Sequence, residues 1–149
     1  MAAATIAAVA PPDGRSRRGR LLLAGGARTT IHVACHDADR TEIRVAVLGN
    51  EHLEPWCARH GVDEALVGGF FVRPDGTPLG EVRTHGVARE HVPFDAPWHT
   101  VRPCLHVEGG RARIARRHEL PPAPRGDVLQ AGPLLLAGGE VAYDPDADA

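Results

Sequence analysis

The chain has 149 residues, with 17 basic and 19 acidic side chains and a formal net charge of −2 at pH 7. A chain of this length folds as one domain, and its charge provides no field that would attract nucleic acid or an anionic membrane. No apolar run approaches the roughly 18 residues that span a bilayer, and no basic segment precedes the apolar start. We therefore expect a cytoplasmic protein without a signal peptide, with secretion as the alternative if the start is misplaced, and neither a nucleic-acid nor a membrane partner.

Three cysteines, Cys35, Cys57 and Cys104, are spaced widely along the chain. An odd number at such spacing argues against a disulfide framework and fits a reducing compartment. Each cysteine lies close to a histidine, so zinc ligation is one interpretation, but the spacing of paired zinc ligands is missing. Burial as small apolar side chains is the other interpretation, and we expect neither a metal site nor a cofactor.

The first 19 residues combine Ala, Pro, Gly and arginines without a periodic pattern and are interpreted as a disordered leader. After it, the apolar segment 21–23 is predicted as a strand, and segments 29–35 and 42–48 carry the alternation that is typical of strands. Turn-forming residues separate the last two segments, which predicts that these pair as a hairpin. A short helix is predicted over 51–60, with a core-facing stripe of Leu53, Trp56 and Cys57 between the N-cap Asn50 and the stop Gly61.

The stretch from residue 65 to 86 constrains the function most, because two adjacent glycines interrupt an apolar run. Gly68 and Gly69 stand between Val67 and Phe70. A glycine pair inside a strand loses backbone entropy and leaves no side chain to pack. One interpretation is a bulge or a sharp bend where a neighbouring strand crosses, and the other is a place where a ligand approaches the backbone.

After a Pro-Asp-Gly turn at 74–76, the segment 78–84 is predicted to return as a strand. Glu81, Arg83 and His85 alternate at this position, so they would share one face. A carboxylate, a guanidinium and an imidazole together provide an acid or base, an anion ligand and a proton-transfer group. A solvated surface stripe is the alternative interpretation.

The last third of the chain is predicted to hold two hairpins joined by a proline-rich connector. The first spans 100–115 and turns at 108–110. The apolar run over 127–143 pauses at Gly132-Pro133, which predicts a kinked or edge strand, and turns at Gly138-Gly139. Together these elements predict an α+β fold of mostly antiparallel or mixed sheet with one short helix.

The sequence lacks several common catalytic motifs, which limits the reactions that we expect of the protein. No GxSxG elbow, phosphate-binding glycine loop or HExxH helix is present, and the only serine, Ser16, lies in the expected leader. Serine-nucleophile chemistry is therefore excluded. His91 and His99 follow the central hairpin among several carboxylates, where they are either acid and base groups or parts of a solvated loop.

Taken in order, several segments resemble the N-terminal half of the phosphodiester glycosidase family over about residues 28–143. The matching segments are Gly68-Gly69-Phe70-Phe71, Asp75-Gly76 with Pro78-Leu79-Gly80, Gln130–Leu136 and Gly138-Gly139. Two features depart from the family pattern. Val67 stands where the family places an asparagine, and the family's second half, with an arginine strand and further carboxylates, is absent. Residues 20–149 are therefore expected to form the first part of a larger domain that is open at its C-terminal end.

The resemblance implies a hydrolase that cleaves a sugar-1-phosphodiester, with a sugar phosphodiester or another glycan as its partner. The candidate catalytic residues are Glu81 and His85. The candidate substrate-binding residues are Gly68, Gly69, Phe70, Arg83, Gln130 and Gly132. Competing interpretations are a non-catalytic carbohydrate-binding or structural protein on the same scaffold, and an incomplete gene product with exposed strand edges. The sequence leaves the oligomeric state open.

Overall fold

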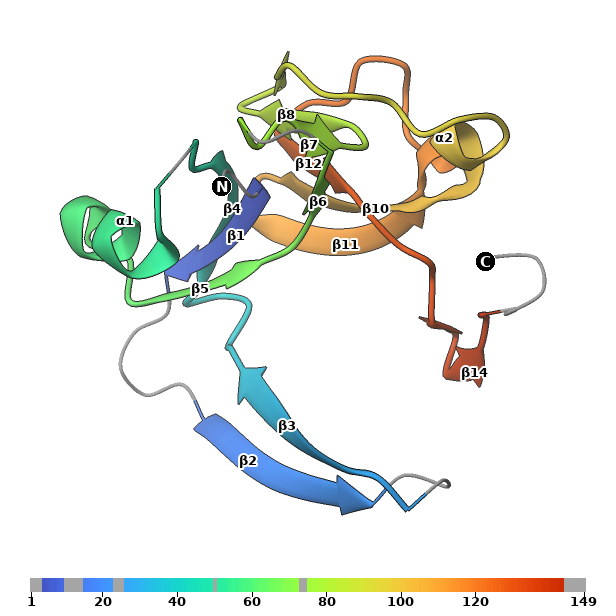
Figure 1. Cartoon of the computed structure of the whole chain (residues 1–149). Coiled ribbons are helices and arrows are strands. Elements are labelled where there is room, and N and C mark those ends of the chain that lie inside the picture. Colours follow the sequence, from blue (N-terminus) through green and yellow to red (C-terminus); the bar gives the residue numbers. More distant parts are fainter. Residues whose placement is uncertain (1–3, 10–14, 23–25, 50, 73–74, 144–149) are drawn as a thin grey trace.

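Figure 1 shows the computed structural model of the chain, which describes residues 4–9, 15–22, 26–49, 51–72 and 75–143. The described part is mostly antiparallel sheet with two short helices, which confirms the predicted α+β class. None of the helices in these ranges is long or apolar enough to span a membrane. Asn50 and Pro74, expected as an N-cap and a turn residue, lie outside the described residues.

The larger sheet has the strand order β11-β10-β12-β8-β9, with every neighbouring pair antiparallel. Its central strand β12 is buried at all four positions, which is typical of a strand covered on both faces. The β10–β11 hairpin sets Leu105 opposite Ile114 and Val107 opposite Ala112, as the alternation predicts. The strands are β8 (Val82–Thr84), β9 (Val87–Ala88), β10 (Pro103–Glu108), β11 (Arg111–Arg116) and β12 (Asp127–Gln130).

The smaller sheet has the order β4-β1-β5 and carries helix α1 (Leu53–His60) beside it (Figure 1). The helix ends where predicted, because Gly61 adopts the left-handed conformation at φ 63° and its N–H reaches the Cys57 carbonyl. Its N-cap is His52, which makes no capping hydrogen bond through its side chain. The strands are β1 (Ala4–Val9), β4 (Glu42–Val47) and β5 (Glu64–Val67).

Two small apolar clusters lie on opposite faces of the larger sheet. Val128 and Leu129 are consecutive in β12, so their side chains point to opposite faces. Leu129 packs with Val82 and with Val45 of β4, so this cluster joins the two sheets. The cluster on the other face consists of Cys104, Ala115, Leu120 and Val128.

Strand pairing near the N-terminus differs from the predicted pairing. β2 (Arg15–Leu22) pairs with β3 (Arg28–Cys35) in a ribbon that projects away from the two sheets (Figure 1). β4 pairs with β1 instead of β3, so the predicted hairpin of 29–35 with 42–48 is wrong. Alternation marks a segment as a strand but does not select its partner, and β1 and most of β2 lie within the expected leader.

The predicted returning strand over 78–84 is broken in the middle. β6 (Phe70–Phe71) pairs with β7 (Pro78–Leu79), and β8 begins only at Val82. Gly80 causes the break, because it adopts φ 89° and its N–H donates to the Val92 carbonyl at 2.8 Å. A Cβ at this position would lie 2.5 Å from Phe94 Cε2.

Three short elements complete the described fold. One helical turn, α2 (Trp98–Val101), occupies the position where the sequence predicted the start of a hairpin strand. A 3₁₀ turn, η1 (Arg117–Glu119), opens the proline-rich connector. The last ribbon, β13 (Leu136–Ala137) with β14 (Glu140–Val141), turns at Gly138-Gly139 as predicted.

Gly80→Ala is expected to destabilise the fold by about 3 kcal/mol, the sum of a left-handed backbone and an overpacked contact. The inserted methyl group would meet Phe94 at 2.5 Å and the Gln130 carbonyl oxygen at 2.7 Å. Gly109→Ala is the matched control, because Gly109 also has a positive φ but a methyl group there would meet nothing within 4 Å. Urea unfolding should therefore give a clearly larger loss for Gly80→Ala, and equal losses would contradict the packing at Gly80.

Candidate functional site

A cleft of about 670 Å³ opens beside strand β4. Its apolar wall consists of Val45, Ala46 and Val47, and its polar groups come from the loops around β7, β8 and β9. An apolar wall with a few convergent polar groups is the usual composition of a small-molecule site, and this volume falls within the usual range. The polar side chains on the cleft are Asp75, Thr77, Thr84, His85, Arg89 and Glu90.

Arg89 places a positive charge on this cleft. Its backbone N–H donates to the Val82 carbonyl at 2.8 Å, and its side-chain Nε donates to Thr84 Oγ1. Thr84 is buried, so the guanidinium is anchored on the β8 side. Within the described residues, Nε is the only guanidinium nitrogen of Arg89 that makes such a contact, so the two terminal nitrogens have the geometry to chelate an anion.

His85 lies in the two-residue turn between β8 and β9 and lines the cleft. His85 and Gly86 have φ values of 54° and 77°, the signature of a type I′ hairpin turn. The predicted shared face of Glu81, Arg83 and His85 is therefore wrong for His85, since the strand ends at Thr84. Glu81 and Arg83 do meet, but they are not among the residues that line the cleft.

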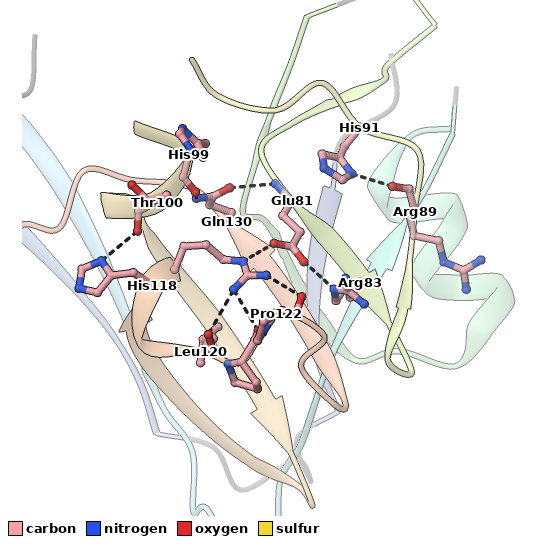
Figure 2. Close-up of polar contacts among 12 residues, drawn as sticks. Glu81, Arg83, Arg89, His91, His99, Thr100, His118, Leu120, Pro122 and Gln130 are labelled. Atoms are coloured by element: carbon pink, nitrogen blue, oxygen red, sulfur yellow. Dashed lines mark hydrogen bonds and ion pairs between the residues drawn. The ribbon is translucent and has the colours of Figure 1, made fainter. Parts of the chain in front are cut away.

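Glu81 is held between two arginines in a cluster that Figure 2 shows in close-up. Its Oε1 accepts a hydrogen bond from Arg83 Nε at 2.5 Å, and its Oε2 accepts one from Arg117 Nε. The Glu81 side chain is only 13% exposed and each arginine side chain 16%. Arg83 also donates to the Gly86 carbonyl, and Arg117 donates to the carbonyls of residues 120–122.

This geometry fixes the charge state of Glu81. Burial by itself raises the pKa of Glu81, but the hydrogen bonds from Arg83 and Arg117 outweigh it and hold the pKa below its ordinary value. The carboxylate is therefore ionised at neutral pH, with both oxygens bound by guanidinium groups. Such a group is unsuited to act as a general acid, which must carry a proton at the working pH.

Cys104 is buried close enough to the cluster for the Glu81 charge to act on its thiol. Burial, followed by the nearby Glu81 charge, raises the pKa of its thiol to about 12. The prediction of burial is thus confirmed for Cys104, but it is wrong for Cys35, which is exposed. Within the described ranges, no His, Cys, Asp and Glu side chains gather in a group of three that could hold a metal ion.

Two of the predicted substrate-binding residues have structural partners. Gln130 is buried, and its amide bridges two elements: Oε1 accepts from the Glu81 N–H at 3.1 Å and Nε2 donates to the His99 carbonyl at 3.0 Å (Figure 2). Gly132 packs so closely that a Cβ would lie 2.7 Å from Pro103 Cδ. Hydrogen bonding within the fold therefore explains the glutamine at position 130, and close packing explains the glycine at position 132.

The glycine pair and the aromatic residue after it lie away from the cleft. Gly68 and Gly69 form the break between β5 and β6, and Phe70 is 57% exposed. Gly68 shares with Gly132 an apolar groove of about 380 Å³, which is a different site from the cleft. The pair forms the bend between these two strands, whereas a neighbouring strand that crosses there and a ligand that approaches the backbone both stay predictions.

Three residues at the cleft or in its support are not predicted from the sequence: Arg89 on the cleft, Arg117 beside Glu81, and the buried Asp127, which hydrogen-bonds the backbone of Val45 and His85. Arg89 reaches the cleft through a hairpin turn that alternation did not place, and Arg117 reaches Glu81 across 36 residues. For Asp127 the sequence offers one signal, an acidic residue directly before the apolar pair Val128 and Leu129. Comparisons of the chain with protein-family models, with curated proteins and with solved structures found no match.

Glu81→Gln is expected to lower the free energy of unfolding at pH 7 by about 2 kcal/mol, because both arginines lose a charged acceptor. The folded-state pKa of Glu81 is depressed by Arg83 and Arg117. This stabilisation is therefore complete above the unfolded-state value of about 4.3 and disappears as the pH falls through the folded-state value. Urea unfolding at pH 7 and below pH 4 should show the difference between variant and wild type shrinking with acid.

Glu51→Gln is the matched control for this change. It breaks a two-fold ion pair with Arg59, whose side chain is 59% exposed, so solvent screening makes the loss smaller. Equal losses for the two variants at pH 7 would contradict a structural role of the Glu81 cluster.

Proposed function

We propose that the cleft binds a sugar-1-phosphodiester and belongs to a glycosidase that cleaves the bond between the anomeric carbon and the phosphodiester oxygen. The observation that carries the proposal is the position of Arg89 on the cleft, together with His85, Glu90 and an apolar wall. A guanidinium is suited to two phosphate oxygens at once, and the apolar wall is suited to the hydrophobic face of a sugar ring.

The chemistry of such a reaction matches the groups that surround the cleft. A phosphodiester leaves readily as an anion, so the site must bind phosphate, stabilise an oxocarbenium-like transition state and activate water. Arg89 would bind the phosphate, and His85 or Glu90 would exchange protons with water or with the leaving oxygen. In the family that the chain resembles, further carboxylates belong to a second half of the domain, so hydrolysis is proposed for the domain that includes them.

Glu81 has a structural role in this proposal, in place of the catalytic role expected from the sequence. Its two ion pairs fix Arg83 and Arg117, and Arg83 in turn bonds the Gly86 carbonyl in the turn that carries His85. We therefore assign Glu81 to the support of the cleft rather than to proton transfer.

A non-catalytic carbohydrate-binding protein is the second candidate. It is favoured by the engagement of both Glu81 oxygens, because a retaining or inverting glycosidase needs a pair of available carboxyl groups. Release of N-acetylglucosamine from a phosphodiester separates the two candidates. Binding with release supports the enzyme, whereas binding without release supports the binding protein.

Arg89→Gln is expected to weaken binding of a sugar phosphodiester at least tenfold, because a charge-assisted contact is lost. A suitable probe is the methyl phosphodiester of N-acetylglucosamine 1-phosphate, with affinity measured by titration calorimetry. Arg111→Gln is the control, since Arg111 is an exposed arginine on the β10–β11 hairpin and is not part of the cleft. The proposal fails if Arg89→Gln binds the probe as tightly as the Arg111→Gln control.

A further inference from the structure

A buried carboxylate joins the two sheets directly behind the cleft. Asp127, at the start of β12, is 6% exposed. Its Oδ2 accepts the backbone N–H of Val45 at 2.9 Å, and its Oδ1 accepts the backbone N–H of His85 at 2.6 Å. Val45 belongs to the smaller sheet, and His85 to the β8–β9 turn of the larger one, so the two oxygens of one side chain hold both sheets.

Both partners of Asp127 line the cleft. The carboxylate therefore fixes the separation between the apolar wall on β4 and the turn that carries His85. Only a side chain with two acceptor atoms satisfies both N–H groups. In asparagine one of the two atoms is a donor, which would face an N–H and repel it.

The backbone at His85 is unusual. Within the described residues, His85 is the only non-glycine residue with a positive φ. The first central position of a type I′ turn favours asparagine, aspartate or glycine, so histidine is a poor choice for the turn itself. A strained residue persists where its surroundings hold it, and such residues concentrate at binding sites.

His85 lines two cavities. One is the cleft, and the other is a pocket of about 160 Å³ next to Arg44 and Asp127. The backbone N–H of His85 is used by Asp127, which leaves the imidazole as the part of the residue that can serve the cleft. The choice of histidine at a position that suits asparagine therefore points to a role for its side chain.

We infer that His85 is a second ligand to the phosphodiester beside Arg89, and that Asp127 is the positioning residue that holds His85 and the β4 wall in register. An imidazole N–H donates a hydrogen bond to a phosphate oxygen in either of its charge states. The inference deepens the proposed function and rests on it, since it names how the same cleft binds the same ligand.

His85→Asn is the decisive variant. Asparagine keeps the type I′ turn and the backbone hydrogen bond to Asp127, but it removes the imidazole from the cleft. We expect the urea midpoint to stay equal or to rise, and the affinity for the methyl phosphodiester of N-acetylglucosamine 1-phosphate to fall about tenfold. A residue that serves only the turn would leave the affinity unchanged, so unchanged affinity in His85→Asn overturns the inference.

Asp127 is tested through its coupling to His85. Asp127→Asn should weaken binding in the wild-type background and cost less affinity in the His85→Asn background, where the ring is gone and only the β4 wall is left for Asp127 to position. Fully additive losses would contradict a positioning role. Asp37→Asn is the control, since Asp37 also accepts a backbone N–H, from Asp39, but on an exposed loop.

Asp127→Asn removes a link between the sheets and can prevent folding, so a measurement on the wild type accompanies it. The amide protons of His85 and Val45 should be shifted downfield in NMR spectra and be protected from exchange in the absence of ligand. Rapid exchange of both amides would overturn the role of Asp127.

Failure of the inference and failure of the proposed function give different results. If Arg89→Gln weakens binding and His85→Asn leaves the affinity unchanged, the cleft still binds phosphate and the inference about His85 is wrong. If the wild type does not bind the phosphodiester, or if neither variant changes its affinity, both the proposed function and the inference are wrong.

Discussion

The arrangement of the two sheets depends on the buried carboxylate of Asp127. A charged group at 6% exposure is costly unless hydrogen bonds replace the lost water, and the N–H groups of Val45 and His85 supply these bonds. The apolar cluster of Val45, Val82 and Leu129 lies at the same junction, so polar and apolar contacts reinforce each other there. The cleft forms where these contacts bring β4 next to the β8–β9 turn.

A second polar network surrounds Glu81 and supports the larger sheet. Arg117 connects Glu81 to the proline-rich connector, and Gln130 connects the Glu81 backbone to α2 through the His99 carbonyl (Figure 2). Arg83 and Gln130, which the sequence pattern assigns to substrate binding, therefore stabilise the fold. The proposed ligand-binding groups are His85, in the β8–β9 turn, and Arg89, directly after β9. The two networks meet at the turn itself, because Arg83 donates to the carbonyl of Gly86.

Local patterns in the sequence predict some of the elements but not how the strands pair. The β10–β11 hairpin and the end of α1 at Gly61 follow from alternation, turn residues and a C-cap glycine, all of which act within a few residues. The pairing of β4 with β1 depends on packing between distant segments and has no local signal. The contacts of Asp127 could not be predicted for the same reason, since it accepts hydrogen bonds from backbone N–H groups 42 and 82 residues away. Almost every residue type has a backbone N–H, so the sequence does not mark which residues donate.

The central claim is that a sugar phosphodiester binds between β4 and the β8–β9 turn, and mapping of backbone amide shifts by NMR tests it most directly. Titration with the methyl phosphodiester of N-acetylglucosamine 1-phosphate should perturb the amides of residues 45–47 and 84–90, the segments that contribute to the cleft. Perturbations confined to Gly68, Gly132 and the apolar groove around them would contradict the claim and place the ligand at the other site.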